Sequence, residues 1–172
     1  MKGTVVLSHG LDSGPQASKV TALAEVAETL GWTSVRPDYR DLDATRDPMA
    51  IDERIARALA NAPADGPVVF AGSSMGAFTS GFASCRRPAE ALFLMALPLA
   101  IPDYPRSFEA ARVPTVLVHA WDDELCPVEA AIAFARSRGD TLHLVPDDHR
   151  LGAHVAYCAE AFARLLHGLE RR

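Results

Sequence analysis

The chain has 172 residues, of which 49% are hydrophobic and 23% charged, and its formal net charge at pH 7 is -5. This length and composition predict one globular domain, residues 1–172, with a sizeable core, and exclude a disordered or membrane-spanning chain. The negative charge disfavours nucleic acid or an anionic membrane surface as a partner. No signal-like apolar segment with a cleavage site opens the chain, so we expect a cytoplasmic protein.

Three cysteines, Cys85, Cys126 and Cys158, are widely spaced and form no C-x-x-C motif. This pattern favours reduced structural thiols over a disulfide framework or a zinc site. The chain also lacks the H-E-x-x-H, G-x-G-x-x-G and P-loop motifs. We therefore expect neither a metal nor a cofactor.

Six short apolar runs predict β-strands, and most of them are continuous rather than alternating. Continuous apolar runs are typical of strands that are covered on both faces of a parallel sheet. The predicted strands are residues 4–8, 33–36, 68–71, 91–97, 115–119 and 141–145.

Helical periodicity fills most of the segments between these runs. Apolar residues recur at i, i+3, i+4 and i+7 from Val20 to Leu30, from Ile51 to Ala62, from Val128 to Ala135 and from Val155 to Leu169. Alternating strands and helices predict an α/β fold, a doubly wound sheet of about six mainly parallel strands with helices on both faces. Ligands of such sheets bind at the carboxyl ends of the strands.

The third predicted strand is followed by Gly72-Ser73-Ser74-Met75-Gly76, a G-x-S-x-G sequence, and then by a stretch of small residues that can form a helix. A sharp strand–turn–helix connection would expose the hydroxyl of Ser74 and aim the N–H of Met75 at the same point. It would also crowd the backbone on both sides of the serine, which explains glycine at 72 and 76. The motif predicts Ser74 as a nucleophile.

Polar residues also follow three other predicted strands. The sequence after the first is His9-Gly10-Leu11-Asp12-Ser13-Gly14, after the fifth Ala120-Trp121-Asp122-Asp123-Glu124, and after the sixth Pro146-Asp147-Asp148-His149. A hydroxyl, a carboxylate and an imidazole thus follow one another in the chain order Ser, Asp, His at one sheet edge. This order and placement are typical of α/β-hydrolases.

The segments HGLDSGP, GSSMG, AWDDELCP and DDHRL resemble those of the small bacterial serine α/β-hydrolases, an esterase-like group without a lid. The resemblance covers essentially the whole chain. It implies Ser74 as nucleophile, Asp123 as acid, His149 as base, and the N–H groups of Leu11 and Met75 as the oxyanion hole. It also implies a compact fold without a cap domain.

The sequence departs from the family pattern in three places. The family acid usually lies in Gly-x-x-Asp-x-x-Val/Ile-Pro; counting back from Pro127 selects Asp123, and Asp122 remains the alternative. Ala120 replaces the expected glycine and Cys126 the aliphatic residue. The two antiparallel strands that open the full family fold are also missing.

We therefore predict a serine hydrolase that cleaves carboxylic esters through an acyl-enzyme, with a small-molecule ester or thioester as its partner. A thioesterase or an acyltransferase using the same residues, and a binding module without catalysis, are the alternatives. Only Pro98 to Pro114 joins the fourth and fifth predicted strands, where larger lipases insert a helical cap. We expect an open site that prefers short acyl chains.

The other histidines have structural interpretations. We expect His9 to shape the turn beside the oxyanion loop, His119 and His143 to lie on strands, and His154 to lie on a helix surface. Cys126 lacks the sharp turn of a nucleophile.

Overall fold

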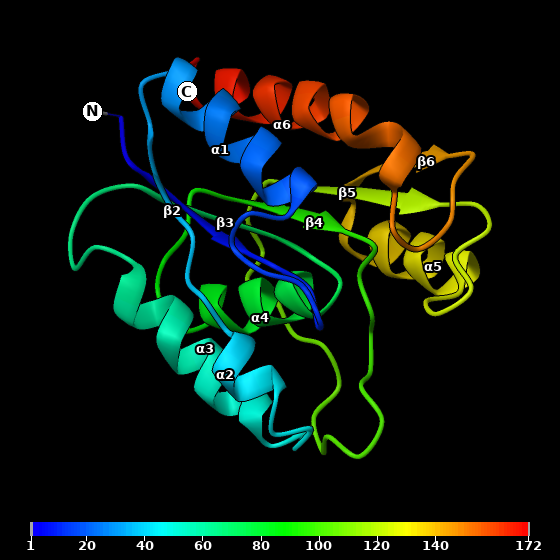
Figure 1. Cartoon of the computed structure of the whole chain (residues 1–172). Helices are drawn as coiled ribbons and strands as arrows, with labels where there is room; N and C mark the ends of the chain where they lie inside the picture. Colours follow the sequence, from blue (N-terminus) through cyan, green and yellow to red (C-terminus); the bar gives the residue numbers. More distant parts are fainter. Residues whose placement is uncertain (1, 172) are drawn as a thin grey trace.

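The computed structural model describes residues 2–171 and contains one parallel sheet with helices on both faces (Figure 1). The strands are β1 (Thr4–Ser8), β2 (Thr33–Val35), β3 (Val68–Ser73), β4 (Ala91–Met95), β5 (Thr115–Ala120) and β6 (Thr141–Val145). The helices are α1 (Ser18–Thr29), α2 (Arg40–Asp43), α3 (Ala50–Asn61), α4 (Met75–Ser84), α5 (Val128–Arg138) and α6 (Val155–Leu169), with a 3₁₀ turn at Gly152–His154.

The six strands are ordered β2-β1-β3-β4-β5-β6, and every neighbouring pair is parallel. The register sets Ser8 opposite Gly72 and Ala120 opposite Val145. Because of this register the carboxyl ends of β1 and β3, and those of β5 and β6, lie level with each other. The loops that follow these strands therefore meet at one edge of the sheet.

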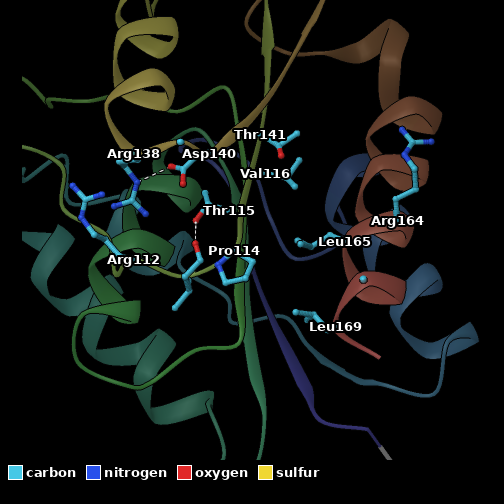
Figure 2. A pocket seen from close by; sticks show the side chains of 13 residues that line it. Arg112, Pro114, Thr115, Val116, Arg138, Asp140, Thr141, Arg164, Leu165 and Leu169 are labelled. Atoms are coloured by element: carbon cyan, nitrogen blue, oxygen red, sulfur yellow. Dashed lines mark hydrogen bonds and ion pairs between the residues drawn. The ribbon is translucent and has the colours of Figure 1, made fainter. Parts of the chain in front are cut away.

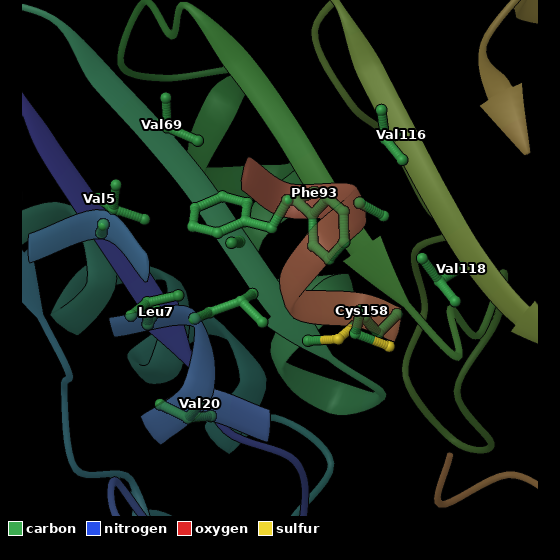
Figure 3. Close-up of a cluster of buried hydrophobic side chains, with 14 of the residues drawn as sticks. Val5, Leu7, Val20, Val69, Phe93, Val116, Val118 and Cys158 are labelled. Carbon is green, nitrogen blue, oxygen red and sulfur yellow. The ribbon is translucent and has the colours of Figure 1, made fainter. Parts of the chain in front are cut away.

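Successive residues of the buried strands face opposite layers. Val5 and Leu7 of β1 pack in a core cluster with apolar residues of α1 and α6, including Val20 and Cys158 (Figure 3). Val6 packs in a second cluster with residues of α2, α4 and α5. Helices α1 and α6 thus cover one face of the sheet, and the remaining helices cover the other (Figure 1). Burial on both faces explains why these strands are apolar throughout.

The structure confirms the predicted compact α/β-hydrolase fold class, its six strands and the absence of a cap domain among residues 2–171. Strand β4 ends at Met95, two residues earlier than predicted, because Ala96 has a φ of 46° and cannot continue a strand. The short helix α2 was not predicted; its four residues are too few to show periodicity. Residues 96–114 contain neither a helix nor a strand. In the part of the chain that is described, no helix is both long and apolar enough to cross a bilayer.

Candidate active site

Ser74 lies in a sharp turn between β3 and α4, as the pentapeptide predicts. Its backbone has φ 54° and ψ -118°, which is unfavourable for a residue with a side chain. The N–H of Ser74 donates to the carbonyl of Met95 at 2.9 Å, and its carbonyl accepts from Phe78 at 3.1 Å in the first turn of α4. Strand and helix therefore hold the serine from both sides in this conformation.

Glycines 72 and 76 allow the turn to be this tight. A Cβ atom on Gly72 would lie 2.3 Å from the carbonyl carbon of Gly76, and one on Gly76 would lie 1.9 Å from the carbonyl oxygen of Ser8. Both contacts involve backbone atoms, which cannot move aside as a flexible side chain can. The two glycines thus bring the N-terminus of α4 against the end of β1.

Three side chains from three loops form a continuous chain of hydrogen bonds. Nε2 of His149 lies 2.8 Å from Oγ of Ser74, and Nδ1 of His149 lies 2.9 and 2.8 Å from Oδ1 and Oδ2 of Asp123. The side chain of Asp123 is fully buried, and that of His149 is 10% exposed. This arrangement places one imidazole between a hydroxyl and a carboxylate, as nucleophilic catalysis requires.

The carboxylate of Asp123 is held by its own loop. Its Oδ1 accepts the N–H of Leu125 at 2.9 Å and that of Cys126 at 2.7 Å. The Cys126 carbonyl lies 2.8 Å from Nε2 of His119, which also lies 3.4 Å from Asp123 Oδ2. The neighbouring Asp122 is exposed and not bonded to His149. The geometry therefore favours Asp123 over Asp122 as the partner of the imidazole.

Two residues that line the cavity beside Ser74 have backbone N–H groups without an acceptor in the described part of the chain. Leu11 and Met75 both line this cavity, and neither N–H donates to an acceptor within residues 2–171. Met75 is the first residue of α4, so its N–H lies at the positive end of the helix dipole. Such free N–H groups can stabilise negative charge on a substrate oxygen.

A buried polar cluster holds the loop that carries Leu11. His9 is fully buried; its Nε2 accepts the N–H of Tyr39 at 3.0 Å, so Nδ1 carries the proton and donates to the carbonyl of Gly10 at 2.7 Å. The His9 carbonyl accepts a hydrogen bond from Nη2 of the buried Arg54. These bonds fix the carbonyls of residues 9 and 10 and confirm the predicted turn-shaping role of His9.

His143 and His154 are bonded to partners other than Ser74, and the three cysteines form no disulfide among residues 2–171. His143 Nδ1 lies 2.8 Å from the Tyr157 hydroxyl, and His154, the residue that precedes α6, bonds Asp147 at 2.9 Å. All three cysteines are free thiols. Burial and the nearby carboxylates raise the pKa of Cys126 to about 12, so this thiol stays protonated at neutral pH.

Asp123, Cys126 and His149 bring three potential metal ligands within 4.8 Å of one another. Nδ1 of His149 and both carboxylate oxygens are joined in hydrogen bonds. The group is better explained by the Ser74–His149–Asp123 chain itself.

Two hollows lie at opposite edges of the sheet. The larger, of about 600 Å³, is lined by the amino ends of β5 and β6 together with residues of α6, including Thr115, Thr141 and Arg164 (Figure 2). Its lining contains no serine, cysteine or histidine. The smaller, of about 140 Å³, includes Leu11 and Met75 and therefore adjoins Ser74. We assign the functional site to the smaller hollow because Met75 in its lining is the neighbour of Ser74 in the chain.

A solved structure from Xanthomonas campestris pv. campestris, assigned to hydrolases of the alpha/beta superfamily, is 49% identical to this chain. The match covers 96% of this chain and 99% of the other, with a TM-score of 0.92. The chain belongs to the α/β-hydrolase superfamily. This membership supports hydrolase activity. No protein-family model and no protein of curated function matches the chain.

More distant solved structures share the fold. The Xanthomonas campestris protein XC6422, described as an a/b serine hydrolase without lid, has 19% identity and a TM-score of 0.64, over 97% of this chain and 81% of its own. Est1E from Butyrivibrio proteoclasticus has 16% identity and a TM-score of 0.72, over 99% of this chain and 89% of its own. At these identities the likeness shows the fold alone.

Sequence reasoning missed Arg54 and Asp43, a buried ion pair that lines the cavity beside Ser74. A signal for Arg54 was present, because it follows Ile51 by three residues and precedes Ala58 by four, on the apolar face of α3. No comparable signal marks Asp43, since α2 is too short for periodicity.

The neutral state of His9 predicts a pH dependence of stability. Burial lowers the pKa of His9 below its ordinary value near 6.5. The unfolded chain therefore binds a proton at a higher pH than the folded chain does. The contribution of neutral His9 to the free energy of unfolding is fully present above about pH 6.5 and is lost as the pH falls toward the lowered pKa.

We expect His9→Gln, whose amide oxygen can accept the same N–H, to weaken this acid sensitivity. The free energy of unfolding of each protein is measured by urea titration from pH 7.5 to 5. As the pH falls, it should decrease more steeply for the original protein than for His9→Gln, by at most about 1.4 kcal/mol per pH unit. Parallel curves would contradict a neutral buried His9.

Proposed function

We propose that this α/β-hydrolase cleaves carboxylic esters by nucleophilic catalysis, with Ser74 as nucleophile, His149 as general base and Asp123 as the acid of the triad. The observation that carries the proposal is the chain of hydrogen bonds, 2.8 Å from Ser74 to His149 and 2.8 to 2.9 Å from His149 to Asp123. These three residues are held by loops at one edge of the sheet.

The reaction proceeds in two halves. Nε2 of His149 takes the proton of Ser74 while Oγ attacks the ester carbonyl, and Asp123 holds Nδ1–H and stabilises the imidazolium. Collapse of the tetrahedral intermediate expels the alcohol, which receives the proton from His149 and leaves an acyl-serine. Water, activated by the same imidazole, then releases the acid and restores Ser74.

The N–H groups of Leu11 and Met75 form the oxyanion hole of this mechanism. Both lie beside the cavity and have no acceptor among residues 2–171, so they are available for the developing charge. The cluster around His9 and Arg54 keeps the neighbouring carbonyls bonded elsewhere. Without this cluster, the carbonyl of His9 or Gly10 could turn toward the oxyanion, and its partial negative charge would destabilise that intermediate.

Hydrolysis is favoured over acyl transfer because the surroundings of Ser74 are open. Leu11 is 46% exposed, Trp121 53% and Leu125 69%, and residues 96–114 form no cap over them. Water therefore reaches an acyl-serine directly. Esters are supported by the names of two solved structures with this fold, esterase PE8 and Est1E, of which the second has been obtained with ferulic acid bound. Thioesters would react through the same groups.

Substitution of Ser74 tests the nucleophile. We expect Ser74→Ala to lower kcat/KM for a short acyl ester by roughly 10⁴-fold, because its hydroxyl forms the acyl bond. Labelling by a fluorophosphonate probe should also disappear. His149→Ala should likewise abolish labelling, since the hydroxyl then lacks its base.

Two matched variants serve as controls. Ser73→Ala alters the adjacent serine, and His154→Gln alters a histidine that bonds Asp147 instead of Ser74. Both should still label. Normal ester turnover by Ser74→Ala would remove the assignment.

The acid is tested by two neighbouring substitutions. Asp123→Asn should lower kcat by about 10⁴-fold, because an amide cannot stabilise the imidazolium and favours the wrong tautomer. Asp122→Asn should change kcat little, since that side chain is exposed and does not contact His149. Steady-state kinetics on one ester would distinguish them, and the opposite ranking would transfer the role to Asp122.

The cavity beside Ser74, of about 140 Å³, leads us to expect a preference for short acyl groups. The value of kcat/KM should fall steeply from butyryl to palmitoyl esters of the same alcohol, measured below the critical micelle concentration. Faster hydrolysis of the palmitoyl ester would contradict the preference.

A further inference from the structure

The cavity beside Ser74 has apolar walls and one buried charged pair. Its apolar lining includes Leu42, Ile51 and Ile101, whereas Asp43 and Arg54 contribute a carboxylate and a guanidinium. Their side chains are only 6% and 2% exposed. Burying an ion pair is costly unless both partners have their hydrogen bonds completed. A polar atom of Asp43 or Arg54 that lacks a hydrogen bond therefore indicates where a ligand could complete the pair.

The carboxylate of Asp43 is only half bonded. Its Oδ1 accepts from Nη1 of Arg54, whereas its Oδ2 is buried and has no hydrogen-bond partner among residues 2–171. An ionised carboxylate can accept about four hydrogen bonds, and leaving one of its oxygens unpaired in an apolar setting costs roughly 1–3 kcal/mol. A donor that approaches from the cavity would remove this cost.

Arg54 cannot provide that donor by turning toward Oδ2. Its Nη2 donates to the His9 carbonyl, and its Nε lies 3.4 Å from Oγ1 of Thr79. The guanidinium also stacks 4.2 Å from the centre of the Tyr39 ring. These contacts fix the plane of the guanidinium, so Oδ2 of Asp43 receives no hydrogen bond from Arg54.

The other cation at this cavity is also engaged. Arg46 pairs with Asp12 of the oxyanion loop at 2.9 Å. Neither arginine is therefore free to bind an anionic ligand. Apart from the N–H groups of Leu11 and Met75, which the proposed mechanism assigns to the oxyanion, the atom at this cavity without a partner among residues 2–171 is Oδ2 of Asp43. This atom is an acceptor, which selects a hydrogen-bond donor.

We propose that Asp43 accepts a hydrogen bond from the substrate, and that the group entering this cavity is a short apolar segment with a hydroxyl or ammonium at its tip. This inference rests on the proposed ester hydrolysis and narrows its substrate class. It assigns Asp43 a role in specificity. The group belongs to either the acyl or the alcohol half of the ester, and the two halves are tested separately.

The acyl half is tested with three 4-nitrophenyl esters of similar size: 3-hydroxybutyrate, 3-methylbutyrate and 3-oxobutyrate. The alcohol half is tested with 2-hydroxyethyl and propyl butyrate. Each kcat/KM is divided by the hydroxide-catalysed rate of the same ester, so that intrinsic reactivity cancels. In at least one half, the hydroxyl substrate should exceed its methyl counterpart by about tenfold or more.

Replacing Asp43 by Asn reverses the polarity at the position of Oδ2. The amide oxygen can still accept from Arg54, while its NH₂ donates where the carboxylate accepted. If the group is in the acyl half, the 3-oxobutyrate ester should have the lowest corrected kcat/KM of the three for the original protein, because its keto oxygen only accepts hydrogen bonds. In Asp43→Asn its corrected kcat/KM should rise relative to that of the 3-methylbutyrate ester. If the group is in the alcohol half, the hydroxyl preference should fall severalfold. Asp41→Asn is the matched control, because Asp41 also lies in α2 but bonds Arg57.

The outcomes separate this inference from the proposed function. Hydroxyl and methyl substrates hydrolysed equally well in both halves would overturn the inference and leave ester hydrolysis intact. Hydrolysis of none of the esters would overturn both. A hydroxyl preference that Asp41→Asn retains and Asp43→Asn reduces would support the assignment, with urea unfolding showing that both variants fold.

Discussion

The close approach of three backbone segments is the constraint on which the site depends. No side chain fits between Gly72 and Gly76, or between Gly76 and the carbonyl of Ser8. The turn can therefore be tight enough to hold Ser74 at a positive φ, with the N-terminus of α4 against the end of β1. This contact brings the loop after β1 to the reactive serine. One steric condition thus brings Ser74 and Met75 close to the end of β1.

A second layer of buried polar residues supports that geometry from behind. Arg54 joins the His9 carbonyl to Asp43, while His9 joins the backbone of Tyr39 to that of Gly10. Replacing a buried ion pair by well-packed apolar residues is often neutral or stabilising, so stability alone does not explain the Arg54–Asp43 pair. Its bond to the loop after β1, and the unpaired oxygen of Asp43, are what the proposed role of the pair in substrate binding explains.

The same cluster links specificity to catalysis. If the substrate completes the bonding of Asp43, its reactive carbonyl is positioned by a group several atoms away, which is how remote binding lowers the entropic cost of the reaction. The open surroundings of Ser74 make such an anchor more important. Without a cap to enclose the substrate, orientation must come from a few directed contacts.

The sequence by itself determined the parallel α/β sheet, because continuous apolar strands alternate with amphipathic helices. It also determined the candidate residues Ser74 and His149, and Asp123 with Asp122 as its alternative, because local motifs mark loops that a parallel sheet must bring to one edge. Tertiary structure decided what depends on contacts between distant segments: the burial of Asp123 beside exposed Asp122, and the pairing of Arg54 with Asp43. Burial and hydrogen bonds between residues far apart in the sequence produce no recognisable hydrophobic periodicity in a helix as short as α2. Only the packed structure shows which buried polar groups are bonded and which, such as Oδ2 of Asp43, have no partner among residues 2–171.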